Sequence, residues 1–376
     1  MKTPSSSLTL TQRMNIVLIA LFMVMIWLPT LDTLFHLDRA PASNEKRQMA
    51  PFPQLKPGMS GLKEYIAGLE ACFNDHFGFR KRLIHWHNNW KYHLFRDQIG
   101  TEVIIGRDDW LFYTDGDMVE HYRGARQFTP QDLLDWQRLL EHRRNWLAQH
   151  GIKYLFIVAP DKQSVYPEQL PTWLTKVRPD TKLDQFLAYM RAHSTVDVLN
   201  LRPALRDARR IAPTYFKTDT HWNLFGGFVA CQEIVKDLSK LQPELQPPSL
   251  ESFELENKLT SGGDLANLLG LDNSEITEDN TILMVQKTNL PPLEISTNTT
   301  KNPKARESVI IFHDSFGNAI KPFLGSSFGK VVYMGQQELD AGLIEREKPN
   351  IVISEIVERE FNVNDPEKMM AEEMLK

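Results

Sequence analysis

The sequence predicts an α/β domain built on a mostly parallel sheet and preceded by one apolar N-terminal helix. From about residue 100 onward, short apolar β-prone runs alternate with amphipathic helical segments. This alternation is typical of a parallel sheet covered by helices on both faces, which gives three layers. The 376 residues are enough for a substantial core. Residues 16–28, thirteen consecutive apolar side chains, stand apart from this pattern.

The composition excludes several classes of protein. Apolar residues make up 42% and charged residues 24%, which is average for a globular chain and excludes wholesale disorder, collagen and coiled coil. Two cysteines are too few for a disulfide scaffold or a Cys-built zinc ribbon. With 43 Lys+Arg against 48 Asp+Glu, the chain lacks the cationic surface that nucleic acid requires, so we expect no nucleic-acid partner.

The N-terminal apolar block predicts a membrane anchor over residues 14–31. Roughly 17 to 25 mostly apolar residues span a bilayer. The segment after the block offers no A-x-A cleavage site, which favours an uncleaved signal anchor over a cleaved signal peptide or a buried core helix. Lys2 and Arg13 precede the block and Asp32 follows it, so residues 1–13 are expected in the cytoplasm and the rest outside.

Composition also predicts the remaining boundaries. Residues 32–58 are polar and rich in proline, as in a tether between membrane and domain. We expect one domain over residues 59–360 and a C-terminal tail over 361–376, since no internal repeat and no second core are visible.

Hydrophobic periodicity orders the elements of this domain. Two amphipathic helices come first, with these apolar side chains: Leu62, Tyr65, Ile66, Leu69, Phe73 and Phe77 in one, and Leu83, Trp86, Trp90 and Leu94 in the other. A β-hairpin follows at 103–113. Buried strands are expected at 154–160, 196–199, 308–312, 330–334 and 350–354. Helices are expected near 133–147, 183–190, 224–238 and 319–324. Residues 242–301 are predicted to be mostly loop, with little periodicity apart from the run TILMV at 281–285.

The first candidate for chemistry is Ser315. A buried strand runs into Asp314-Ser315 and a helical segment follows, so the hydroxyl is expected at the carboxyl edge of the sheet. Backbone N–H groups and the helix dipole can stabilise an oxyanion at such a place. The alternative is that the pair merely caps the helix.

The second candidate is the segment that contains Asp219 and His221. In an extended loop, residues two apart share a face, so Asp219 can hold the ring of His221 while the other ring nitrogen meets a nucleophile. The alternative is a surface loop with an incidental histidine. A serine at a strand end and an Asp-x-His loop together form the set that a Ser-His-Asp hydrolase or transferase needs.

At these segments the sequence resembles a known family, the alginate O-acetyltransferases of the AlgJ/AlgX type, which have an SGNH-hydrolase-like domain. The resemblance runs from about Asn74 to Arg359. Within this range, Lys162 and Tyr166 match residues of the family's motifs. Five segments carry it in the same order: NDHFGFR, GRDDWLFY, APDKQSVYPEQLP, DTHWN and FHDSF.

The resemblance implies a reaction and partners. Ser315 would be the nucleophile that carries an acetyl group, His221 the general base and Asp219 its orienting partner, with a hydroxyl of an exported polysaccharide as acceptor. A membrane-bound O-acyltransferase of the MBOAT type is the implied donor partner, and the bacterial inner membrane the implied location. Alternatives are a carbohydrate acetylesterase with the same triad and a non-catalytic assembly protein for polysaccharide export.

Other residues have simpler expected roles. We expect no cofactor. We also expect no metal site, since His85 and His87 are two residues apart on a helix, where their side chains diverge. Arg107-Asp108-Asp109 is interpreted as a hairpin turn. Further expectations concern single positions: Trp222 in a sugar site or in packing, Asn318 as an oxyanion donor or a solvent-facing residue, Cys72 and Cys231 as buried free thiols or a disulfide, and Gly226-Gly227 at a close helix–sheet contact.

Overall fold

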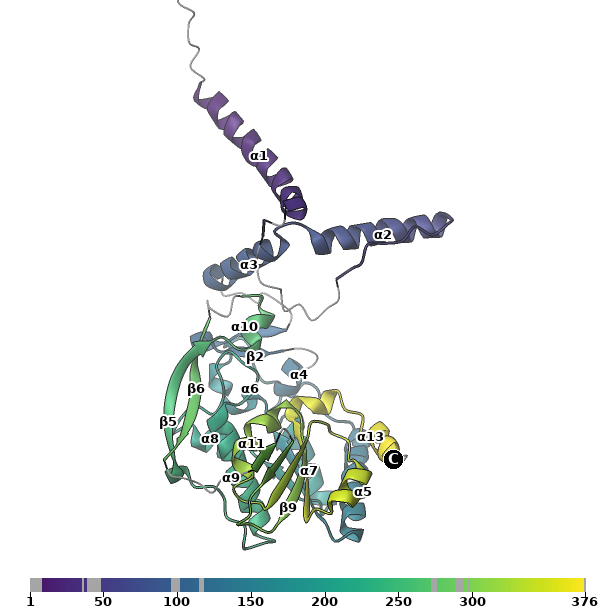
Figure 1. Cartoon of the computed structure of the whole chain (residues 1–376), viewed down its shortest axis with the longest axis vertical. Coiled ribbons are helices and arrows are strands. Elements are labelled where there is room, and N and C mark those ends of the chain that lie inside the picture. Colours follow the sequence, from purple (N-terminus) through teal and green to yellow (C-terminus); the bar gives the residue numbers. More distant parts are fainter. Residues whose placement is uncertain are drawn as a thin grey trace, which may run out of the picture. The chain divides into compact units, whose positions relative to one another are not determined.

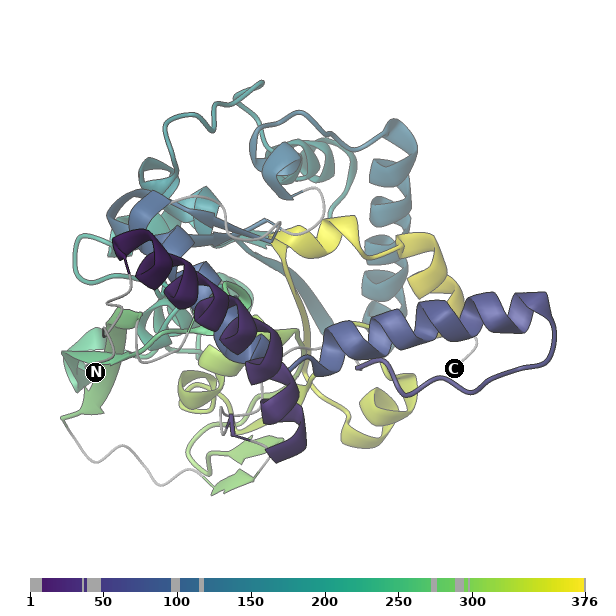
Figure 2. The ribbon, with the colours of Figure 1, turned by 90° about the horizontal axis from the view of Figure 1, so that it is seen from above.

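The computed structural model describes residues 9–35, 37–38, 49–95, 102–114, 118–271, 276–287, 294–296 and 298–374. The chain forms two compact units, Met1–Phe95 and Arg96–Lys376 (Figure 1). The unit that contains the sheet thus begins near residue 96 rather than at the predicted residue 59. It also includes the predicted tail, since α13 (Pro366–Met374) packs on α5 (Pro130–Gln149), as Figures 1 and 2 show.

A buried ion pair joins the described part of this tail, residues 361–374, to the domain. The guanidinium of Arg143 on α5 lies 2.6 Å from the carboxylate of Glu373 on α13, and both side chains are almost fully buried. Met369 of α13 joins the same apolar cluster as Leu140 of α5. Neither contact leaves a periodic signal in a segment this short.

The first unit consists of α1 (Leu10–Phe35), α2 (Met59–His76), α3 (Arg80–Trp90) and one π-helical turn (Lys91–Phe95). Among the described residues, α1 alone is long and apolar enough to cross a membrane, and it extends the predicted span of residues 14–31 at both ends. Of the predicted cytoplasmic segment and linker, residues 1–8, 36 and 39–48 lie outside the described residues.

The second unit is organised around one seven-stranded sheet in the order β4-β3-β11-β9-β10-β8-β7. Its parallel strands are β3 (Lys153–Ala159), β4 (Val198–Asn200), β9 (Ser308–Phe312), β10 (Lys330–Met334) and β11 (Ile351–Val357). The last two strands at one side of the sheet, β8 (Thr299–Lys301) and β7 (Glu294–Ser296) at the edge, are antiparallel. The five predicted sheet strands and the mostly parallel sheet are confirmed.

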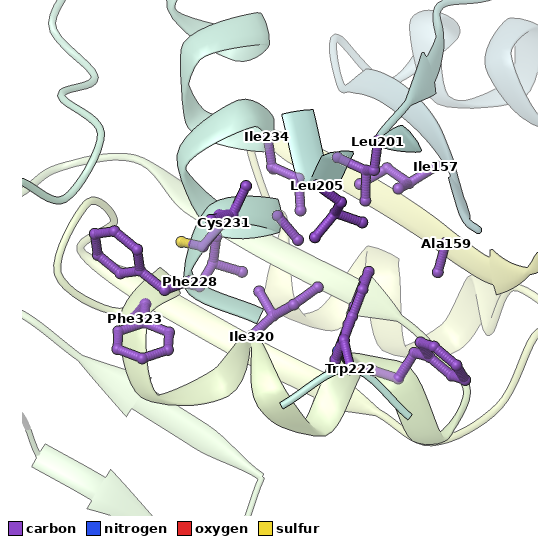
Figure 3. Close-up of a cluster of buried hydrophobic side chains, with 14 of the residues drawn as sticks. Ile157, Ala159, Leu201, Leu205, Trp222, Phe228, Cys231, Ile234, Ile320 and Phe323 are labelled. Atoms are coloured by element: carbon purple, nitrogen blue, oxygen red, sulfur yellow. Dashed lines mark hydrogen bonds between the residues drawn. The ribbon is translucent and has the colours of Figure 1, made fainter. Parts of the chain in front are cut away.

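Helices cover both faces of this sheet, so the domain has three layers. Alternate residues of β3 belong to different clusters: Leu155 and Ile157 lie in one, Phe156 and Val158 in the other. The first face, drawn in Figure 3, packs against α6 (Lys162–Val165), α8 (Arg202–Ala208), α9 (Leu224–Ser239) and α11 (Lys321–Leu324). The second packs against α5, α7 (Lys182–His193), α12 (Ala341–Glu347) and α13.

Two hairpins and several short elements complete the unit. The predicted hairpin is confirmed as β1 (Val103–Ile105) and β2 (Leu111–Tyr113). The mostly-loop prediction for 242–301 is wrong, because β5 (Phe253–Ser261) and β6 (Thr277–Gln286) pair there in a long antiparallel ribbon. β5 exposes side chains on both faces, so it lacks the apolar alternation that reveals a strand. The other helices are α4 (Met118–Tyr122), α10 (Asp264–Leu268) and short 3₁₀ turns.

Candidate active site

Ser315 lies just beyond the carboxyl end of β9, at the start of a 3₁₀ helix (Ser315–Ala319). Asp314 caps this helix by accepting the Phe316 N–H at 2.8 Å, and its second oxygen accepts the Val357 N–H of β11 at 2.7 Å. The capping role considered for this pair therefore falls to Asp314. The Ser315 side chain is exposed, and its backbone N–H lies in the first turn, where helices lack internal acceptors.

His221 lies on the loop between Tyr215 and Trp222, which pair with each other as an isolated bridge. Its Nε2 atom is 2.8 Å from Oγ of Ser315, and its Nδ1 atom is 2.7 Å from Oδ1 of Asp219. The structure thus brings the three residues singled out in the sequence into one chain of hydrogen bonds. Because a carboxylate only accepts, Nδ1 donates to Asp219 and Nε2 is left to accept the Ser315 hydroxyl proton.

The Asp219 carboxylate is held by several donors. Besides the imidazole, its Oδ1 accepts the His221 backbone N–H at 2.9 Å, and its Oδ2 accepts the Asp264 N–H at 3.0 Å. Burial works to raise the pKa of Asp219, but the hydrogen bonds from His221 and Asp264 outweigh it and hold the pKa below the ordinary value. Asp219 is therefore a fixed anion beside the ring.

A second carboxylate, Asp264, was not identified from the sequence. It lies at the start of α10 and accepts the Thr220 N–H at 2.7 Å and the Thr220 hydroxyl at 2.6 Å. Its Oδ2 is 3.8 Å from Nδ1 of His221. Asp264, Asp219 and His221 offer atoms within 4.8 Å of one another, but both ring nitrogens of His221 already have hydrogen-bond partners, so we do not interpret the cluster as a metal site.

Lys162 holds the loop that contains Asp219 and His221 through hydrogen bonds to its backbone. It begins α6, just after the carboxyl end of β3, and its buried Nζ donates to three carbonyl oxygens: those of Phe216 at 3.2 Å, Lys217 at 3.1 Å and Asp219 at 2.7 Å. Burial lowers the pKa of Lys162 to about 8, while the charges of Asp219 and Glu278 act to raise it. The resemblance pointed to this lysine, but nothing in the sequence indicated its partners.

Two glycines allow the surrounding segments to meet. A Cβ atom on Gly263 would lie 2.5 Å from Cβ of Asp219, so only glycine lets this backbone pass the carboxylate. A Cβ atom on Gly227 of α9 would lie 2.3 Å from the carbonyl oxygen of Ala319, at the end of the helix that Ser315 begins. The contact expected at Gly226-Gly227 is thus real, although at Gly227 it is made with a helix rather than with the sheet.

For most of the other residues singled out in the sequence, the structure shows the simpler of the expected roles. Trp222 is buried, and its Nε1 donates to the carbonyl of Phe316 at 2.9 Å, so it packs and does not line a sugar site. Residues Arg107–Asp109 form the 3₁₀ turn of the hairpin. Asn318 is exposed. Both cysteines are free; Cys231 is buried as expected, whereas Cys72 is only half-buried.

A three-layer α/β domain with a hydrogen-bonded Ser, His and Asp at the carboxyl edge of a parallel sheet is the arrangement of a serine hydrolase or acyltransferase. The family model described as "SGNH hydrolase-like domain, acetyltransferase AlgX" matches residues 103–335, more than half of the chain, and spans all three side chains. The chain belongs to this family.

Individual proteins are similar to parts of this chain. The chain is 31% identical over 174 residues to the probable alginate O-acetylase AlgJ of Pseudomonas putida KT2440. That match covers 45% of this chain and 42% of the relative, so the chain spans less than half the length of the relative it matches. The O-acetyltransferase domain of Pseudomonas putida AlgJ aligns with a TM-score of 0.49 at 22% identity, over 73% of this chain and 99% of that one.

A solved structure with a higher TM-score supports the fold. Bacillus cereus PatB1 aligns with a TM-score of 0.53 at 16% identity, over 71% of this chain and 99% of that chain. The predicted fold class and family are confirmed.

Proposed function

We propose that this protein is a membrane-anchored O-acetyltransferase that acetylates hydroxyl groups of an exported polysaccharide through an acetyl-serine intermediate. One observation carries the proposal: the His221 ring bridges Ser315 and Asp219 at 2.8 and 2.7 Å, with a tautomer ready to accept the serine proton. The family's acetyltransferase description, and the name of the AlgJ relative as a probable alginate O-acetylase, support acetyl as the group and a polysaccharide such as alginate as the acceptor.

The mechanism has two transfers. Oγ of Ser315 attacks the carbonyl carbon of the acetyl donor while its proton passes to Nε2 of His221. The tetrahedral oxyanion accepts a hydrogen bond from the Ser315 backbone N–H. When the tetrahedral intermediate collapses, the donor's leaving group departs and takes the proton from Nε2. Asp219 stabilises the imidazolium between these steps.

The second transfer returns the enzyme to its starting state. A sugar hydroxyl attacks the carbonyl carbon of the acetyl-serine as Nε2 of His221 takes its proton. When the tetrahedral intermediate collapses, Ser315 Oγ leaves and recovers that proton, so the product is an O-acetylated sugar. Water in place of the sugar would give acetate. Ser315 is exposed, so the choice of acceptor depends on what occupies the site.

We base the proposed cellular location of the protein on α1 as a membrane anchor. Its length and composition support a single span of the cytoplasmic membrane, with the sheet-containing unit on the outer side. An acetyl donor outside the cytoplasm has to be delivered through that membrane, and a multi-pass O-acyltransferase of the MBOAT type is the partner that we propose for this step.

The test uses the full-length chain in detergent with a chromogenic acetyl ester, with and without alginate. We expect ester turnover, an acetyl adduct on Ser315 by intact mass spectrometry, and acetylated alginate. Ser315→Ala should lose the adduct and turnover, whereas Ser239→Ala, at the end of α9, should keep both. Turnover that persists in Ser315→Ala refutes the nucleophile. Acetate release without acetylated sugar identifies an esterase, and a chain that never turns over ester is an assembly protein.

A further inference from the structure

Two helices of the first unit present large apolar side chains to solvent. On α2 these are Met59, Leu62, Ile66 and Phe73, and on α3 and the turn after it Leu83, Trp86, Trp90 and Leu94, with exposed fractions between 44% and 75%. Their spacings of three, four and seven residues place them along one face of each helix. Exposed apolar stripes of this size mark an interaction surface.

We propose that α2 and α3 lie in the outer interfacial layer of the membrane that α1 spans, with these apolar faces inserted among the lipid headgroups. This inference rests on the proposed anchor and goes beyond it, because it assigns a second membrane-binding element. The occupant of the apolar faces is lipid, and the argument for lipid has three steps.

The first step is the position of α2 and α3 along α1, which sets their depth relative to the membrane. Asp32, near the carboxyl end of α1, accepts the Phe79 backbone N–H at 2.9 Å, where α2 gives way to α3. Gly78 packs so closely that a Cβ atom there would lie 2.0 Å from the carbonyl oxygen of Pro29. The α2–α3 junction is therefore fixed against the last two turns of α1.

Those turns coincide with the membrane surface. With a rise of about 1.5 Å per residue, the 26 residues of α1 are about 39 Å long, compared with about 30 Å of hydrocarbon. In Figure 1, α2 and α3 leave this end of α1 on opposite sides, and neither continues its direction.

The second step is the chemistry of α3. The segment 77–95 contains no acidic residue and four basic ones, of which Arg82 pairs with Asp38 at 2.6 Å while Arg80, Lys81 and Lys91 add to the positive charge of α3 and the turn after it. Basic residues combined with exposed Trp86 and Trp90 are the pattern of a helix that lies in the interface of an anionic membrane. Tryptophan in particular prefers the headgroup level, where its ring is buried and its N–H stays hydrated.

The third step is a cavity of about 730 Å³ within this unit, between α1 and α2. Met25 and Pro29 of α1 and Leu69 and Phe73 of α2 line it, and the lining is mostly apolar. Water does not fill an apolar cavity favourably, whereas an acyl chain does. One wall is the proposed membrane helix itself, so lipid reaches this cavity without leaving the bilayer.

The experiment places single fluorescent labels on the full-length chain in a Cys72→Ser/Cys231→Ser background. Trp86→Cys and Ile66→Cys label the apolar faces. Asn88→Cys and Glu64→Cys are matched controls on other faces of the same two helices, and Leu21→Cys reports on α1. The protein is reconstituted in liposomes of phosphatidylethanolamine and phosphatidylglycerol. Quenching is measured with lipids that carry a nitroxide near the headgroup, and separately with aqueous iodide.

We expect the labels at 86 and 66 to be quenched by the lipid nitroxide about twofold more than those at 88 and 64, with the reverse order for iodide. If iodide quenches both faces equally while Leu21→Cys is protected, the interfacial inference is wrong and the anchor stands. If iodide also reaches the label at 21, the anchor itself fails. Labels at 86 and 66 that neither quencher reaches indicate that protein covers these faces, and also overturn the inference.

Discussion

The Nε2 atom of His221 lies 2.8 Å from Oγ of Ser315, although the two residues are 94 positions apart in the chain. Two further contacts fix this approach. The Trp222 indole N–H is bonded to the Phe316 carbonyl, and the His221 ring packs on the Phe316 ring with centroids 4.9 Å apart. The residues that follow His221 and Ser315 therefore hold the two loops together, so the proposed nucleophile and base are already aligned without substrate.

Replacing Asp219 with asparagine should lower the kcat for ester turnover by about 10²- to 10⁴-fold, because an amide neither fixes the ring tautomer nor stabilises the imidazolium. KM should change little. Steady-state kinetics with the chromogenic acetyl ester measure both constants. Asp207→Asn, at an exposed position of α8, is the control and should match the wild type. Unchanged kcat in Asp219→Asn would show that the ring is oriented by something else.

Asp264 should matter through the loop rather than through the reacting atoms. Asp264→Ala removes the acceptor of the Thr220 N–H and hydroxyl, so we expect kcat to fall about tenfold as His221 loses its fixed position. Asp264→Asn keeps an acceptor oxygen and should recover most of this loss. The same kinetic assay distinguishes the two. Equal activity of both variants and the wild type would mean that the loop is held without Asp264.

Lys162→Met should weaken the loop that carries Asp219 and His221. Three carbonyl oxygens lose their shared donor, and unsatisfied buried acceptors typically cost about 1–3 kcal/mol of unfolding free energy. Thermal melting measures the stability, and ester turnover should fall with it. Lys258→Met, at an exposed position on β5, controls for loss of charge. A variant as stable and active as the wild type would show that these bonds contribute nothing.

Gly263→Ala should impair activity by displacing the Asp219 carboxylate. The new Cβ atom would lie 2.5 Å from Cβ and 2.8 Å from Oδ2 of Asp219, closer than real contacts allow. We expect kcat to fall about 10- to 100-fold, by analogy with other small misplacements of catalytic groups. Gly335→Ala is the matched control, because nothing lies within 4 Å of its added Cβ. Comparable kinetics for the two variants would contradict the tight approach.

Glu355→Gln should stabilise the protein increasingly as pH rises. Burial, and then the charge of Asp314, raise the pKa of the Glu355 carboxyl well above its ordinary value of 4.5. Above that value the folded state therefore binds a proton that the unfolded state releases, so the wild type loses stability with rising pH. Glutamine stays neutral and escapes this loss.

Melting temperatures of both proteins between about pH 4 and 8 test this, since the linkage acts across that range. The advantage of Glu355→Gln should grow with pH. The exposed Glu345→Gln should track the wild type throughout. A constant difference between Glu355→Gln and wild type would show that Glu355 is ionised in the folded protein.

The sequence by itself determined the five parallel strands of the sheet, the membrane-length helix and the three candidate site residues. A strand buried on both faces has a continuous run of apolar residues, which can be recognised without knowing the neighbouring strands. Therefore β3, β9, β10 and β11 could each be predicted separately. Ser315 after a buried strand and the Asp219-x-His221 spacing are also local features.

Only the tertiary structure decided which loops meet. Asp264 and Lys162 become partners of the Asp219–His221 loop because α10 and α6 reach it from distant parts of the chain, and no local pattern records such contacts. The same holds for the burial of Trp222 and for the docking of α13 on α5. Periodicity reports which face of an element is buried, whereas the choice of partner depends on packing among segments far apart in sequence.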